Sequence, residues 1–505
     1  MSLPNPTFIG QQAEVDGKTY QAASVNPPVW RGVTTGTHGR RLQTLEGFRS
    51  SLDMRIGVNY SMGGSRVEWR GHTLESDGGS NWGIVRTGDS TLLTDDDGSI
   101  FIIVNDSVNG VWVEANLRGA KINVRKFGCL PSIDGTTGML NALSYAKSVG
   151  SIVYVPSDEA NDYIVNAQMD TTGTGIVGDG RELSVIKTNS GSLPAVLHQG
   201  GPSSSRKFTH LKGVQFLNNG GTGDCIEWNL SPRHNFMSDV KVFGYYQGAA
   251  VKVKDQIWIT DMDDVYLDNC KYGLFFDRQP VGQIGGSHTF RGGAIEGCER
   301  AIEGELKNLA FYGTTIEGNR GIVESFSAGN MVGGVCLLGI GEGPIAFHDC
   351  WMEGNGLPAI ICGEGATSEL TATFQVTING GRHQPASLLW IRGNTTNISI
   401  RDINFGWASA NRDPIIWVDS RNARVHIENI RYNKVYQSIY GVFGGFNFLP
   451  KTTMFVDGGQ VIFKQNANGD IFVGSDKLFA RVDTLANPVD WTFDVYTEGG
   501  SSRTF

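Results

Sequence analysis

The chain has 505 residues, and 40% of them are hydrophobic, which is enough for a large apolar core. Its formal net charge of -9 argues against a nucleic-acid partner, and no polybasic patch marks a membrane surface. No apolar run reaches the length of a membrane span, and the N-terminus lacks the features of a signal peptide, so we expect synthesis in a cytoplasm and no membrane insertion.

The first 118 residues form two segments of different character. Residues 1–44 are polar, punctuated by Pro and Gly, and only weakly periodic, which predicts an N-terminal arm. Residues 45–118 are expected to be a β-rich domain that precedes the main body of the chain. This segment contains Gly57-Val58-Asn59-Tyr60 and glycine pairs at 63–64 and 78–79.

Residues 119–180 carry an ordered series of short motifs. Phe-Gly at 127–128 is followed by Asp-Gly-Thr at 134–136 and by a run with apolar residues on one helical face, which predicts a helix around 139–148. The series ends with a strand that stops at Pro156, a Tyr-Ile strand at 163–164, and Gly-x-x-Gly-x-Gly at 175–180.

Nine segments between residues 211 and 432 share one frame, and successive starts lie 21 to 36 residues apart. The frame begins with an apolar residue, the first-place residue, and the later places are counted as residues after it. Place two is Gly, Asp or Asn, and in all but one segment place five is a second apolar or aromatic residue. The frames begin at Leu211, Met237, Met262, Phe290, Phe311, Phe347, Ile378, Ile400 and Ile427. The residues at place five are Phe216, Val242, Leu267, Ile295, Ile316, Met352, His383, Phe405 and Tyr432.

The alternation inside each frame is that of a strand with one buried face, because places three and five are mostly apolar and places four and six are more mixed. A second short apolar run follows each frame, for example at 225–228, 273–276, 359–362 and 415–418. Two short strands per unit do not fit helical repeats. They predict an all-β fold, a right-handed parallel β-helix over 119–450.

Two further features interrupt or end the repeat. The 36-residue step between Phe311 and Phe347 is too long for one plain coil, and its surplus at 327–343 is expected to form a loop or a hidden partial coil. Residues 451–505 contain alternating runs that predict the antiparallel strands of a small C-terminal β-domain, for trimerisation or glycan binding.

The second place of the frame is occupied only by Gly, Asp and Asn, the residues that tolerate a left-handed backbone. We therefore expect a one-residue corner there. Asp349 lies near Glu353 and resembles a catalytic partner, but this corner gives it a structural explanation that we favour.

Place six should face solvent, and four consecutive coils carry an acid there: Asp268, Glu296, Glu317 and Glu353. We call these four residues the acid ladder. Stacked strands lie about 4.8 Å apart, so at least one of these carboxyls should keep its proton to a higher pH. Acids on neighbouring coils would have nearly the carboxyl spacing of retaining glycosidases, and acids two coils apart nearly that of inverting ones. The sequence does not choose between these two spacings. The alternative is that Glu-Gly here is only a solvated corner.

Place four adds Tyr266, Trp351 and Arg382 beside the acids. Flat rings stack on sugar faces, carboxylates bind hydroxyls, and Arg382 could bind an acidic sugar or keep one Glu ionised. For Trp351, contact with another copy of the chain is an equal alternative. No metal or cofactor is expected: Cys270 and Cys298 share a frame position, but no further ligand joins them at metal-binding spacing.

The motif series at 123–180 resembles the opening of pectate-lyase-like β-helix proteins, whose helix caps the open end of the solenoid. The glycine-rich segment before it, together with the coils that carry Ile-Glu-Gly, is similar to bacteriophage tailspikes that depolymerise capsule or O-antigen. The resemblance covers roughly residues 45–440 and departs from the usual pattern at Cys129 and in a shortened Asp-Gly-Thr segment.

The resemblance implies a homotrimer in the virion, attached to phage tail or baseplate proteins through residues 1–44, that processes a bacterial surface polysaccharide. It implicates Glu296, Glu317 and Glu353, of which we favour Glu317 and Glu353 as a hydrolytic pair supported by Glu296. Asp268 and Asp349 would contribute to substrate binding. The alternatives are a polysaccharide lyase that uses Arg382 on a uronate, and a non-catalytic adhesin.

Overall fold

The computed structural model describes residues 48–58, 62–117, 119, 121–199, 209–229, 235–254, 259–277, 287–305, 308–326, 329–338, 343–356, 359–362, 373–383, 389–392 and 395–405, and elsewhere only strands. The chain divides into two compact units, residues 1–149 and 150–505. None of the helices in the described residues has the length and apolarity needed to cross a membrane.

The first unit contains two antiparallel sheets and a short helix, α1 (Ser51–Gly57). Within the segment predicted to be an arm, β1 (Gln12–Val15), β2 (Lys18–Val25) and β3 (Pro28–Val33) form a three-stranded sheet. A second sheet has the order β4-β5-β7-β6, with strands at Arg66–Trp69, Asn81–Gly88, Gly110–Ala115 and Ile100–Val104. Its core includes Met54, Trp69 and Phe101, and the two aromatic rings pack edge to face at 5.3 Å.

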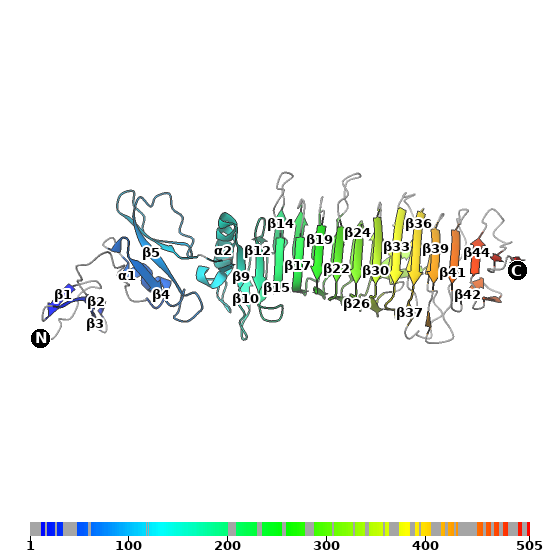
Figure 1. The fold of residues 1–505 in the computed structure, drawn as a ribbon, viewed down its shortest axis with the longest axis horizontal. Coiled ribbons are helices and arrows are strands. Elements are labelled where there is room, and N and C mark those ends of the chain that lie inside the picture. Colours follow the sequence, from blue (N-terminus) through cyan, green and yellow to red (C-terminus); the bar gives the residue numbers. More distant parts are fainter. Residues whose placement is uncertain are drawn as a thin grey trace. The chain divides into compact units, whose positions relative to one another are not determined.

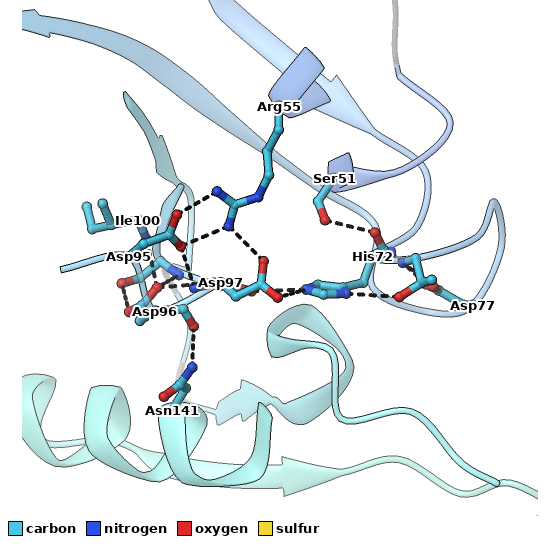
Figure 2. Close-up of polar contacts among 12 residues, drawn as sticks. Ser51, Arg55, His72, Asp77, Asp95, Asp96, Asp97, Ile100 and Asn141 are labelled. Atoms are coloured by element: carbon cyan, nitrogen blue, oxygen red, sulfur yellow. Dashed lines mark hydrogen bonds and ion pairs between the residues drawn. The ribbon is translucent and has the colours of Figure 1, made fainter. Parts of the chain in front are cut away.

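A network of charged side chains ties α1 to the loop before β6 (Figure 2). Arg55 donates to Asp95 at 2.5 and 2.8 Å and to Asp97 at 2.8 Å. The other oxygen of the Asp97 carboxylate lies 3.3 Å from Nε2 of the buried His72. Burial opposes a charge on His72, but the Asp97 carboxylate outweighs it and raises the pKa of His72. The network therefore fixes the loop to the helix.

The predicted helix is present as α2 (Thr136–Val149), which follows β8 (Lys121–Asn123) and a 3₁₀ turn at Val124–Phe127. It buries Met139, Ala142, Leu143 and Ala146 as one stripe, whereas Leu140 is half-buried. The helix is confirmed, and its role as a cap on the first coil stays a prediction.

The second unit is a parallel β-helix in which each complete coil contributes three strand segments (Figure 1). Strands at each position pair in parallel with those of the neighbouring coils, and we call the three stacks the first, second and third face. β15 (Thr209–Asn218) and β17 (Asn235–Phe243) run through both the first and the second face. The predicted all-β solenoid is thereby confirmed.

The strands of each face follow in chain order. The first face contains β9 (Ile152–Val155), β12 (Gly175–Gly178), β19 (Ile259–Asp263), β22 (Ser287–Arg291), β25 (Leu309–Tyr312), β30 (Gly343–His348), β33 (Thr373–Asn379), β36 (Thr395–Arg401) and β39 (Ala423–Glu428). The second face contains β10 (Tyr163–Val165), β13 (Val185–Thr188), β20 (Tyr266–Asp268), β23 (Ala294–Glu296), β26 (Thr315–Glu317), β31 (Trp351–Glu353), β34 (Arg382–His383), β37 (Asn404–Phe405) and β40 (Arg431–Tyr432). The third face contains β11 (Met169–Asp170), β14 (Val196–Gln199), β16 (Ile226–Asn229), β18 (Ala249–Val253), β21 (Tyr272–Phe276), β24 (Arg300–Glu305), β29 (Val335–Leu338), β32 (Ile360–Cys362), β35 (Leu389–Arg392) and β38 (Ile416–Asp419).

The predicted register is confirmed residue by residue. Each first-place residue pairs with the first-place residue of the next coil, from Leu211 to Ile427. The same holds for place five, from Phe216 to Tyr432. Inside the solenoid the rings of Phe311 and Phe347 stack at 5.1 Å, which shows that identical frame positions supply the continuous core.

The corner predicted at place two is also confirmed. In the described coils this residue has a φ between 52° and 71°, in the left-handed region. Asp349 is one of them, with a φ of 52°, and its backbone N–H donates to the carbonyl of Asn379 at 2.8 Å. Its place in the sequence therefore has a structural cause, and a part in substrate binding stays a proposal.

The long step after Phe311 contains a hairpin rather than the loop or partial coil expected from the sequence. β27 (Ile322–Phe326) and β28 (Gly329–Gly333) pair as antiparallel strands. The insertion thus begins earlier than residue 327, and Val335–Leu338, which the sequence assigned to the surplus, is an ordinary third-face strand.

The last strands combine both kinds of pairing. β41 (Thr452–Asp457) extends the first face in parallel with β39 and pairs on its other side with the antiparallel β44 (Leu478–Val482). β45 (Phe493–Tyr496) and β46 (Ser502–Thr504) continue from β44, and β42 (Val461–Gln465) forms a hairpin with β43 (Gly469–Val473). Antiparallel strands thus follow β41, which still belongs to the solenoid.

Candidate active site on the second face

The acid ladder occupies consecutive coils in one register. Asp268 pairs with Glu296, Glu296 with Glu317, and Glu317 with Glu353, each at the end of its second-face strand. Glu317 is exposed and the other three acids are half-buried. Adjacent backbones in a sheet lie about 4.8 Å apart, so four carboxylates share a strip of surface about 14 Å long. Beyond Glu353, the place-six residues Gln384, Gly406 and Asn433 lie outside the described residues.

A left-handed corner follows directly after each acid. The next residues are Asn269, Gly297, Gly318 and Gly354, with φ values between 53° and 64°. The two interpretations of the Glu-Gly pairs are therefore compatible. The glycine turns the chain, and the acid before it is the last outward residue of the strand.

Two buried asparagines support the corners behind the last two acids. Asn319 and Asn355 both lie three places beyond their coil's place five, and the amide of each donates to the place-five carbonyl of the preceding coil, Ile295 at 3.0 Å and Ile316 at 2.7 Å. Asn319 also donates to Asn355 at 2.8 Å and accepts from the N–H of Cys298. These bonds hold the coils that carry Glu296, Glu317 and Glu353 in a fixed register.

The electrostatics of the ladder single out Glu296. Partial burial raises its pKa above the ordinary value, and the charges of Glu317 and Asp268 on either side raise it further. Partial burial also raises the pKa of Asp268, which Lys241 on the preceding coil opposes. A carboxyl whose pKa is raised by the neighbouring acids, as the ladder predicts, is therefore Glu296, whereas the pKa of Asp268 is raised by burial alone.

Trp351 stands beside the last acid of the ladder. Its indole N–H donates to Oε2 of Glu353 at 2.8 Å, and the guanidinium of Arg382 lies 4.7 Å from its ring centre. Even so, 38% of the residue is exposed. The indole thus orients the Glu353 carboxylate and offers an aromatic surface next to it.

Tyr266 is covered from one side by an arginine that the sequence did not point to. The guanidinium of Arg181 lies 4.0 Å from the Tyr266 ring centre and forms ion pairs with the corner residues Asp239, at 2.9 Å, and Asp264, at 2.7 Å. Arg181 therefore occupies a surface of Tyr266 on which a sugar could stack.

The cysteines next to the ladder are buried. Cys270 and Cys298 lie on neighbouring coils, and burial raises the pKa of Cys270 well above its ordinary value. Within the described residues, no group of three or more His, Cys, Asp or Glu side chains could hold a metal ion.

Several of these residues carried no functional prediction. Asn319 and Asn355 could have been found, because both follow Glu-Gly in their coils. Lys241 could also have been found, because it occupies place four of the coil next to that of Tyr266. Arg181 could not, because its contact with Asp264 depends on how distant coils stack. The arrangement as a whole can bind sugar hydroxyls through ionised carboxylates and supply a proton from a half-buried one.

Comparison with known proteins shows the fold. No family model matches the chain, and no curated protein matches its sequence. The full-length tailspike protein 2 of an Escherichia coli O157:H7 bacteriophage is 13% identical, with a TM-score of 0.53 over 100% of this chain and 78% of that one. The enzymatically active domain of bacteriophage CBA120 tailspike protein 2 is 12% identical, with a TM-score of 0.50 over 91% of this chain and 79% of that one. The predicted resemblance to tailspikes is thus confirmed at the level of fold.

Proposed function

We propose that this chain is a phage tailspike that binds a bacterial surface polysaccharide, O-antigen or capsule, and hydrolyses it at the acid ladder. The observation that carries this proposal is the ladder itself, four carboxylates in one register on the outer side of the second face. Stacked like charges are unfavourable for folding alone, which favours a functional explanation. The tailspike with the same fold, whose isolated domain is named enzymatically active, supports it.

Glu296 is the proton donor in this proposal. Its raised pKa keeps it protonated to higher pH, and it can transfer that proton to the glycosidic oxygen as the bond to the anomeric carbon breaks. This changes the assignment favoured from sequence, in which Glu296 only supports the pair Glu317 and Glu353. Glu317 keeps a place in the site, because its charge sustains the raised pKa of Glu296.

Glu353 is the general base. It lies two coils from Glu296, about 9–10 Å at the backbone, which is near the carboxyl spacing of inverting glycosidases and leaves room for a water molecule. The Glu353 carboxylate takes a proton from that water as the water oxygen attacks the anomeric carbon. Trp351 fixes the carboxylate and, with Arg382, Asp268, Tyr266 and Asp349, contributes to substrate binding.

The products of the reaction test this function. Polysaccharides from a panel of Gram-negative capsules and O-antigens are incubated with the protein, and we expect shorter chains with new reducing ends whose anomeric configuration is inverted in the first NMR spectra. Retained configuration would contradict the Glu296–Glu353 assignment and favour a neighbouring pair. Products that absorb in the ultraviolet would identify a lyase, and saturable binding without shortening would identify an adhesin.

The same proposal places the protein in the virion as a homotrimer attached to the phage tail or baseplate through its N-terminus. What supports it is the likeness in fold to full-length tailspike protein 2, which extends over 100% of this chain. Light scattering tests the oligomeric state.

A further inference from the structure

An aromatic pair lies on the first face, in two of the coils that carry the acid ladder, with Tyr312 exposed and His348 half-buried. Tyr312 and His348 follow the first-place residues Phe311 and Phe347 and pair across β25 and β30. Their rings stack with centres 4.9 Å apart and planes 13° apart. Tyr312 remains 43% exposed despite this stack. Neither residue takes part in the chemistry proposed for the acid ladder.

Backbone hydrogen bonds at the adjoining corner hold this pair in place. The N–H of Gly292 donates to the carbonyl of Tyr312, and the N–H of Gly313 donates to the carbonyl of His348, both at 2.8 Å. The two rings therefore stand on consecutive strands whose spacing is fixed. A rigid aromatic surface loses little conformational freedom when a ligand covers it.

The corner between this pair and the acid ladder is open. Gly313 is exposed, and a Cβ built on it meets no atom within 4 Å. A Cβ on Gly292 meets only a backbone atom of Asp264, at 4.0 Å. At the same place, the coils before and after carry the carboxylates of Asp264 and Asp349. At Gly292 and Gly313 the corner therefore has no side chain. These two glycines lie between Tyr312 on the first face and Glu296 and Glu317 on the second.

Polar groups line the same column of the first face. Arg291 pairs with Tyr312 on one side, and Asn379 pairs with His348 on the other. The side chain of Arg291 is 53% exposed, although one of its nitrogens lies 3.6 Å from Asp261. Their N–H groups can donate to the hydroxyls of a ring that lies on the aromatic pair.

We propose that Tyr312 and His348 form a second sugar-binding site, an aromatic platform for a pyranose ring of the same polysaccharide chain that is bound at the acid ladder. The polymer crosses the open corner at Gly292 and Gly313 from the first to the second face. This site rests on the proposed function, because its occupant is a further part of that substrate. It binds and does not react, so it acts on the affinity for polymer and not on the chemical step.

The test compares Tyr312→Ala with Tyr312→Phe, which keeps the ring, and with Tyr246→Ala. Tyr246 is 63% exposed and lies on a coil that has Phe243 in place of an acid at place six. The probes are the purified polysaccharides of the Gram-negative panel. We expect Tyr312→Ala to weaken polymer binding and raise KM about tenfold, the loss of one stacking contact, with kcat unchanged. Tyr312→Phe and Tyr246→Ala should behave as wild type.

The other outcomes separate the platform from the proposed function. Wild-type affinity and KM in Tyr312→Ala, with the polymer still bound and shortened, would overturn the platform and leave the proposed function standing. An equal loss in Tyr312→Phe would overturn stacking as its basis. Failure of the wild-type protein to bind or shorten every polysaccharide of the panel would overturn both.

Discussion

Glu296 has a raised pKa because burial is reinforced by Glu317 and Asp268, the acids on both neighbouring coils. If it is the proton donor, Glu296→Gln should lower kcat by about 100- to 10,000-fold without unfolding the protein. Glu299→Gln, which changes an exposed glutamate three residues further on, should leave kcat unchanged. Release of reducing ends measures both. A Glu296→Gln variant with wild-type kcat would remove Glu296 from the chemistry.

The pH profile tests the same residue through its neighbours. An acid must be protonated to act, so activity should fall as the pH rises through the pKa of Glu296. Asp268→Asn removes a negative charge that raises this pKa and should move that limb to lower pH. Lys241→Gln removes a positive charge that lowers it and should move the limb to higher pH. Shifts with the same sign in both variants would contradict the assignment.

A buried histidine makes the solenoid sensitive to acid. Burial lowers the pKa of His383, at place five of its coil, to about 4. The unfolded chain takes up this proton near pH 6.5, so the stability that the neutral ring contributes is lost as the pH falls from 6.5 to 4, by up to about 3 kcal/mol. His383→Met, which copies Met352 of the previous coil, should reduce this loss. Urea unfolding at pH 7 and at pH 4.5 measures it, and an unchanged loss would rule out His383 as its source.

At the scale of the element, the corners decide where each side chain points. Asp349 has a φ of 52°, which alanine adopts at a cost of about 1–2 kcal/mol and glycine adopts freely. We expect Asp349→Ala to lower the free energy of unfolding by about 1 kcal/mol, and Asp349→Gly to change it by only a few tenths. Urea unfolding distinguishes them. Wild-type stability in Asp349→Ala would show that the corner does not explain this residue.

The buried asparagines behind the acid ladder should also stabilise the solenoid. Asn319→Ala leaves the N–H of Cys298 and the carbonyl of Ile295 without this partner inside the solenoid, so we expect a loss of about 2–3 kcal/mol. Asn319→Cys, the residue of the two preceding coils at this place, should cost no more. Unfolding in urea measures both, and a loss below 0.5 kcal/mol for Asn319→Ala would contradict the supporting role.

What the sequence predicts well is what the repeat itself determines. Each coil must bury its first-place residue and places three and five, so a single frame sets the register from Leu211 to Tyr432, and the acid ladder follows from it. What it predicts poorly are contacts that the repeat does not encode. The hairpin at 322–333 looked like a later loop, and Arg181 reaches Asp264 across coils without any local signal.

For the whole molecule, the proposed function requires that the ladder acts on a polymer that the solenoid holds along its outer faces. The tailspike fold supports such an arrangement but is compatible with many reactions, so the residues and not the fold must carry the claim. We expect light scattering to give three times the chain mass. A stable monomer that still shortens the polysaccharide would show that assembly is not needed for activity.

The most direct measurement is size-exclusion chromatography of a polysaccharide that the wild-type protein shortens, after incubation with Glu296→Gln, Glu317→Gln and Glu353→Gln. We expect Glu296→Gln and Glu353→Gln, folded as judged by their circular dichroism, to leave the polymer at full length, and Glu317→Gln to slow the shortening. Shortening at the wild-type rate by both Glu296→Gln and Glu353→Gln would place the chemistry elsewhere and contradict the account.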